Sequence, residues 1–138
     1  AREKSRDAKR ISDVNQIQLA LQLYYDTNRT FPVALSSLAP TYIPTLPKDP
    51  VGNEVDYAYS AYKGTHAAGD AAPADACDTA AETAKLCLWY HIGASLESDN
   101  AVLTGDFDYL NDGTVKGADT TSCTDAAVTS RKCYDVTP

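Results

Sequence analysis

The chain has 138 residues, which is enough for one domain with a modest hydrophobic core. It carries 12 lysines and arginines against 19 aspartates and glutamates, a net charge of −7. Five of the 12 cations but only two of the 19 anions lie in the first ten residues, so the remainder is strongly acidic. An acidic remainder argues against general nucleic-acid binding, because the phosphate backbone requires an electropositive surface.

An amphipathic helix is predicted at the start of the chain. Apolar residues recur there at spacings of three and four: Ile11, Val14, Ile17, Leu21 and Tyr24, with Leu23 and Tyr25 widening the stripe. Four polar residues between them are expected to face water: Asp13, Asn15, Gln16 and Gln22. No glycine or proline precedes Pro32, so we expect one helix over residues 1–28. Because no capping residue precedes Ala1, we expect that the helix continues a longer upstream segment.

The basic end of this helix is a candidate interaction site. Its five cations are Arg2, Lys4, Arg6, Lys9 and Arg10. They suit contact with anionic lipid, with nucleic acid or with acidic patches on neighbouring copies of the chain. The simpler interpretation is a solvated helix end on which charges of both signs alternate.

Residues 29–53 are predicted to connect the helix to a sheet. Asn28 suits a positive φ at the end of the helix, and Pro32 prevents its continuation. Residues 33–39 are expected to form one or two helical turns with Leu35 and Leu38 inward. Four prolines between residues 40 and 50 then exclude a regular helix or a central strand, so an extended connection is expected, held by Tyr42, Ile43 and Leu46.

Residues 54–138 are predicted to form a small antiparallel sheet with variable loops. Alternation predicts a half-buried strand at 54–62, and a second strand at 86–92 with Leu86, Leu88, Tyr90 and Ile92 on one face. Residues 93–100 are expected to be a loop or a short helix, 101–103 a brief apolar anchor, and 132–136 the last strand. The expected fold is α+β, a long N-terminal amphipathic helix packed on this sheet in one domain over 1–138.

The four cysteines indicate disulfide bonds. No pair has CxxC spacing, so zinc is not indicated. Nine residues separate Cys77 from Cys87, and nine separate Cys123 from Cys133, so we expect these two pairs, although four cysteines allow three connectivities. Two disulfides would place the chain outside the reducing cytoplasm. These residues contain no signal peptide or membrane span, so an exported chain implies processing or truncation upstream.

The ordered series of motifs over residues 1–62 resembles type IV pilins and pseudopilins. The series comprises the helix up to Tyr25-Asp26-Thr27-Asn28, then Phe31-Pro32, then Leu46-Pro47-Lys48-Asp49-Pro50 with Gly52-Asn53, and Tyr57-Ala58-Tyr59. The proline-rich run before a tyrosine-rich strand is similar to the major pseudopilin of type II secretion systems. The run favours a pseudopilin, whereas the paired cysteines and long loops favour a pilus on the cell surface.

The resemblance implies a type IV pilin-like fold and a structural role. Family members are anchored in the inner membrane by a hydrophobic N-terminal half-helix, which is missing here, until they assemble helically into an extracellular filament. Copies of the chain and the pilus or secretion machinery would then be its partners. The charges from Arg2 to Arg10 would pair between protomers, where exposed pairs contribute only about 0–1 kcal/mol each.

An acidic region is a candidate calcium site. Its carboxylates are Asp106, Asp108, Asp112, Asp119 and Asp125, with Asn111 and Gly113 completing a turn. Ca²⁺ takes six to eight oxygen ligands from such loops, although the spacing does not match an EF-hand. Major pseudopilins resembling this chain bind calcium toward the C-terminus, and the resemblance extends here by region only. The alternative is a solvated acidic turn.

Catalytic motifs do not emerge from the sequence. Trp89 and His91 share a strand face with Cys87, which favours outer-face packing or proximity to a disulfide, and no serine has a nucleophile context such as GxSxG. We therefore expect a non-enzyme. The alternatives to a filament subunit are a minor pilin or binding module that captures DNA or a surface, and a secreted calcium-dependent enzyme.

Overall fold

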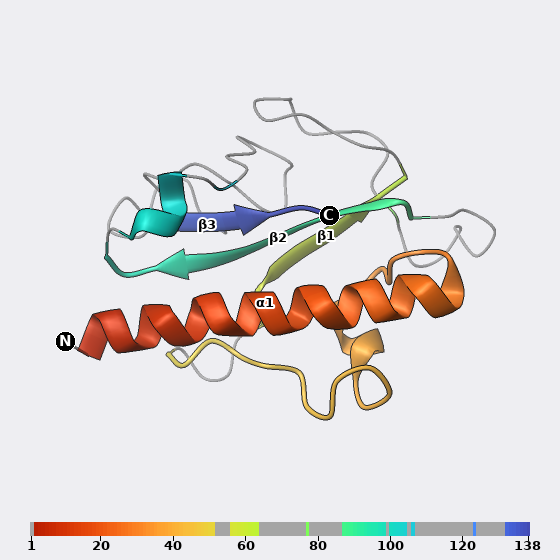
Figure 1. Cartoon of the computed structure of the whole chain (residues 1–138), viewed down its shortest axis with the longest axis horizontal. Coiled ribbons are helices and arrows are strands. Elements are labelled where there is room, and N and C mark those ends of the chain that lie inside the picture. Colours follow the sequence, from red (N-terminus) through yellow and green to blue (C-terminus); the bar gives the residue numbers. More distant parts are fainter. Residues whose placement is uncertain are drawn as a thin grey trace.

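A computed structural model describes residues 2–51, 56–63, 77, 87–98, 100–104, 106, 123 and 132–138. Within these residues the chain forms an α+β arrangement of one long helix and three antiparallel strands, as expected. Helix α1 (Arg2–Asn28) runs along one side of the sheet formed by β1 (Ala58–Tyr62), β2 (Trp89–Leu96) and β3 (Lys132–Val136) (Figure 1). Two short 3₁₀ helices, η1 (Leu35–Leu38) and η2 (Ala101–Thr104), complete the described elements.

The predicted helix is confirmed from Arg2 onward, and its apolar face forms the core. Val14, Ile17 and Leu21 are each 0 % exposed. Two side chains differ from the expectation: Asp13 is buried, while Leu23 is 45 % exposed. Leu23 follows Leu21 by two residues, a rotation of about 200° that carries it to the opposite face. Asp13 tolerates burial because Lys9 and the hydroxyl of Tyr57 both contact its carboxylate.

Helix α1 ends at Asn28, as predicted, but the positive φ lies one residue later than expected. The residue with positive φ is Arg29, at 60°, rather than Asn28. Asn28 keeps the helical conformation, and its Nδ2 donates to the carbonyl oxygen of Tyr24 at 3.0 Å. The N–H of Arg29 still donates to the carbonyl of Tyr25 at 2.7 Å. The turn out of the helix therefore begins at Arg29.

The connection after α1 follows the prediction. Leu35 and Leu38 of η1 are buried, and residues 39–51 contain neither helix nor strand. Ile43 and Leu46 are each 8 % exposed and hold this segment against the core. The segment runs back beside α1 toward the N-terminal half of the helix (Figure 1).

The sheet has the order β1-β2-β3, with both pairs antiparallel. Strand β1 begins at Ala58, later than predicted: residues 56 and 57 lie outside the strand, and 54 and 55 lie outside the described residues. Strand β3 matches the predicted bounds. The apolar anchor at 101–103 lies in η2, where Leu103 is buried.

Strand β2 lies later in the sequence than predicted. It spans Trp89–Leu96, so the loop or short helix expected from residue 93 is wrong as far as Leu96. Leu88 is 46 % exposed instead of facing the core, and Leu86 lies outside the described residues. The physical reason is that β2 pairs on both edges and is buried on both faces, so it lacks the alternation that marks a half-buried strand.

Both disulfides join the cysteines that the sequence paired. Cys77 is bonded to Cys87, and Cys123 to Cys133. The carbonyl of Cys87 accepts the N–H of Phe31 at 2.8 Å, and the N–H of Cys77 donates to the carbonyl of Ala61 at 2.8 Å. The first disulfide therefore joins β1 to the segment that leaves α1.

Candidate functional site

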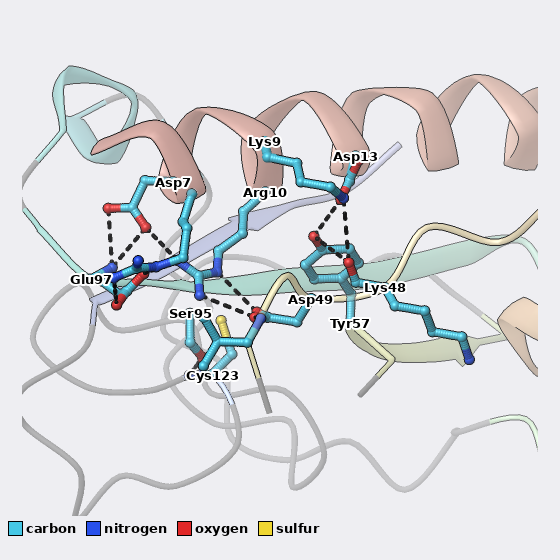
Figure 2. Close-up of polar contacts among 12 residues, drawn as sticks. Asp7, Lys9, Arg10, Asp13, Lys48, Asp49, Tyr57, Ser95, Glu97 and Cys123 are labelled. Carbon is cyan, nitrogen blue, oxygen red and sulfur yellow. Dashed lines mark hydrogen bonds and ion pairs between the residues drawn. The ribbon is translucent and has the colours of Figure 1, made fainter. Parts of the chain in front are cut away.

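The most elaborate polar site in the described residues surrounds Arg10, on the face of α1 that packs against the rest of the chain (Figure 2). The side chain of Arg10 is 0 % exposed. Its Nε and Nη2 donate to the two carboxylate oxygens of Asp49 at 2.9 and 3.0 Å, and its Nη1 donates to Asp7 at 2.8 Å and to Glu97 at 2.7 Å. Arg6 donates to Glu97 at 2.6 and 2.8 Å. We call these five side chains the Arg10 cluster.

The cluster keeps its buried guanidinium charged. Burial acts to lower the pKa of Arg10, but hydrogen bonds to Asp49, Glu97 and Asp7 outweigh it and raise the pKa above its ordinary value. The pKa of Glu97 falls from 4.5 to about 2, chiefly because Arg6 donates to its carboxylate, with Arg10 adding to the effect against desolvation. A charge taken out of water is tolerated only with such pairing.

Asp7 joins α1 to the chain that follows β2. Its carboxylate accepts the N–H of Glu97 at 2.9 and 3.1 Å, and the N–H and hydroxyl of Ser98, each at 3.0 Å. Together with the bond from Arg10, these contacts occupy a carboxylate that is 0 % exposed. The cluster therefore holds three segments together: the first turns of α1, the proline-rich connection at Asp49, and the end of β2.

A second polar group lies one turn further along α1. The hydroxyl of Tyr57 donates to Asp13 Oδ2 at 2.6 Å, and Lys9 Nζ lies 2.6 Å from the same oxygen (Figure 2). Burial and the Asp13 carboxylate raise the pKa of the Tyr57 hydroxyl, so it stays a hydrogen-bond donor. Lys48 pairs with Asp56 at the surface nearby. Asp13 is thus satisfied by groups from α1 and from the start of the sheet.

The structure distributes the five predicted basic residues between two environments. Arg6, Lys9 and Arg10 have carboxylate partners within the same chain, whereas Arg2 and Lys4 are exposed. Arg10 is too deeply buried to meet a neighbouring copy. The sequence pattern did not indicate Asp7, Asp49 and Glu97 as members of the site. Only the i, i+3 spacing of Asp7 and Arg10 signalled a pair, because Glu97 lies 87 residues from Arg10.

The predicted calcium site falls mostly outside the described residues. Asp108, Asp112, Asp119 and Asp125 lie there, while Asp106 Oδ2 accepts the N–H of Asp135 at 3.2 Å. In the part of the chain that the structure describes, no group of three or more His, Cys, Asp or Glu residues could hold a metal. Calcium binding stays a prediction, which melting curves recorded with calcium and with chelator would test.

His91 lies deeper than the sequence suggested. It is 0 % exposed, and its Nε2 lies 2.5 Å from Asp135 Oδ2, which is also 0 % exposed. Trp89, expected on an outer face, is only 5 % exposed. A histidine oriented by a carboxylate resembles part of a catalytic triad, but a substrate would need access that this burial denies. The pair therefore favours a structural link between β2 and β3.

These features define an α+β domain in which one face of a long first helix is fixed to a three-stranded antiparallel sheet by apolar and ionic contacts. Comparisons with protein-family models, with curated proteins and with solved structures found no match. Among the described residues, no helix combines the length and apolar content needed to cross a membrane.

Proposed function

We propose that this chain is a structural subunit of a type IV pilus or pseudopilus filament, which assembles helically through its N-terminal helix. The ordered motifs over residues 1–62 support this proposal, as does the order of the fold, with a long helix followed by an antiparallel sheet. Two disulfides suit an exported protein, since such bonds persist in oxidising compartments.

The observation that carries the proposal is the outer face of α1. Between residues 12 and 23 every exposed side chain is uncharged: Ser12, Asn15, Gln16, Leu19, Gln22 and Leu23. Leu19 is 65 % exposed and Leu23 is 45 % exposed, four residues apart on one face. A helix face that serves only solvation normally carries charges, and 22 % of this chain is charged. An uncharged face with two leucines suits packing against further copies of the chain.

The charges at the start of α1 support a narrower version of the assembly hypothesis. Arg2 and Lys4 remain available to a neighbouring protomer, whereas Arg6 and Arg10 serve the fold of their own chain. Contacts between copies would be heterologous and would not close, as helical growth requires. Before assembly the chain would be held at the inner membrane, and the secretion or pilus machinery would be its other partner.

The test is to place charge on the outer helix face in the cells that make the protein. Leu19→Glu with Leu23→Glu should abolish filaments seen by electron microscopy and in the sheared surface fraction. The matched control is Leu88→Glu, a leucine 46 % exposed before β2, which should leave filaments intact. Melting temperatures should stay near that of the unaltered protein for both variants. Normal filaments in the double variant would refute the proposal.

A further inference from the structure

Asn28, the last residue of α1, begins the sequence Asn28-Arg29-Thr30. An asparagine followed two residues later by serine or threonine is an acceptor for N-linked glycans, provided that the middle residue is not proline. None of the other four asparagines in the chain meets this condition. We propose that Asn28 is a site of N-linked glycosylation, a property independent of the proposed filament role.

The position of Asn28 suits a glycan. Its side chain is exposed, at the end of α1 that lies far from the N-terminus (Figure 1). Its Nδ2 donates to the carbonyl of Tyr24 at 3.0 Å and to the hydroxyl of Tyr42 at 3.1 Å. Glycosylated asparagine keeps one N–H, so one of these bonds persists while water replaces the other at this exposed position. The folded chain therefore accommodates the modification at little cost.

In the folded chain, the hydroxyl that completes the acceptor sequence is already hydrogen-bonded. The hydroxyl oxygen of Thr30 accepts the N–H of Cys87 at 2.8 Å, and the hydroxyl donates to the carbonyl of Phe31 at 3.2 Å. An enzyme that recognises this hydroxyl must reach it before Cys87 does. This hydrogen bond holds Thr30 beside Cys87, which is bonded to Cys77, and we infer that glycosylation precedes closure of this disulfide.

The group transfer needs a lipid-linked oligosaccharyl pyrophosphate as donor and a cellular oligosaccharyltransferase as catalyst. The bond between sugar C1 and the pyrophosphate oxygen breaks, and a bond between C1 and Asn28 Nδ2 forms. The lipid pyrophosphate leaves with the electron pair, and Nδ2 loses one proton. No oxidant or reductant is consumed.

The experiment exports the full chain through cells with an active oligosaccharyltransferase and measures its intact mass before and after peptide-N-glycosidase. The unaltered chain should gain the mass of one oligosaccharide, which the glycosidase removes. Asn28→Gln and Thr30→Ala should lose this increment. Thr30→Ser, which keeps a hydroxyl, should retain it, as should Asn15→Gln, an exposed asparagine of the same helix outside any acceptor sequence.

An unmodified chain from cells that glycosylate a secreted reporter would overturn the assignment, as would an increment that persists in Asn28→Gln. A separate variant tests whether glycosylation precedes closure of the disulfide. Cys77→Ser prevents the first disulfide and should raise the modified fraction. An unchanged or lower fraction would overturn modification before disulfide closure.

Discussion

The two halves of α1 contact the rest of the chain through different kinds of side chain. The first half turns Asp7, Arg10 and Asp13 inward, where hydrogen bonds and ion pairs satisfy them. The second half buries apolar side chains, among them Ile17 and Leu21. Beyond the helix, Phe31 continues the apolar contact: the centroid of its ring lies 4.7 Å from that of Tyr25 and 4.8 Å from that of Tyr90.

The two halves of α1 therefore contribute differently: the second half stabilises the packing of the helix, and the first half defines where the helix lies. Apolar burial has no directional requirement, so the second half stabilises packing without defining which segment lies opposite. Each hydrogen bond of the Arg10 cluster needs a particular donor and acceptor, and bidentate pairing to Asp49 adds geometric specificity. The first half therefore fixes the position of the helix relative to the proline-rich connection and the end of β2.

Removing the centre of the cluster should have the largest effect. Arg10→Met keeps an apolar stem but leaves Asp7 buried without its cationic partner, which should lower the free energy of unfolding by about 3–5 kcal/mol. Lys4→Met is the control, because Lys4 is exposed on the first turns of α1 and surface substitutions usually stay within about 0.5 kcal/mol. Denaturant unfolding measures both. Equal effects of the two variants would show that the cluster does not anchor α1.

Leu21→Ala tests the apolar contacts of the second half of α1. Loss of a fully buried leucine should lower the free energy of unfolding by about 2–5 kcal/mol, through lost transfer energy and a residual cavity. The matched control, Leu19→Ala, changes a leucine 65 % exposed and should stay within about 0.5 kcal/mol. A comparable loss at Leu19 would mean that the face of α1 has been misassigned.

The first disulfide sharpens the comparison because it lies beside the apolar half. Cys77→Ser with Cys87→Ser should cost about 2–3 kcal/mol, the chain-entropy value for a loop of this length. Hydrogen exchange should speed up at the Phe31 amide, which donates to Cys87. Removing the Cys123–Cys133 bond is the control, and it should leave Phe31 protected. Identical exchange at Phe31 in both would contradict a local role.

Tyr57→Phe tests the second polar group. Asp13 would lose a buried 2.6 Å hydrogen bond while keeping Lys9, so stability should fall by about 1–3 kcal/mol. Tyr42→Phe, which removes a hydroxyl at the exposed Asn28, is the control and should be nearly neutral. An unchanged melting temperature for Tyr57→Phe would show that water satisfies Asp13 equally well.

Acid should weaken the first half through Glu97. Because its folded pKa lies at about 2, below the ordinary 4.5, Glu97 contributes stability that is present above pH 4.5 and lost as pH falls toward 2. The slope of unfolding free energy against pH should therefore be shallower in Glu97→Gln than in the unaltered chain. Asn15→Gln, which changes an exposed side chain of α1 that does not titrate, is the control and should keep the slope. Parallel profiles for both variants would show that Glu97 does not contribute to the dependence of stability on pH.

The sequence predicted features whose signal is local. The period of Ile17 and Leu21 gave the helix, and the prolines gave the connection after it. The bounds of strand β2 were not predicted correctly, because a strand buried on both faces shows no alternation of apolar and polar residues. The Arg10 cluster was not predicted, because Asp49 and Glu97 lie far from Arg10 in the sequence and approach it only in the folded chain. In addition, charges near a chain end normally suggest a solvated surface.

The filament proposal is tested most directly by asking what touches the outer face of α1 in the cell. A photo-crosslinking amino acid at position 19, and a second variant carrying it at position 88, would be irradiated in cells that make the protein. We expect a ladder of crosslinked homo-oligomers from position 19 and none from position 88. Absence of homo-oligomers at position 19, or equal ladders at both positions, would contradict assembly through this helix.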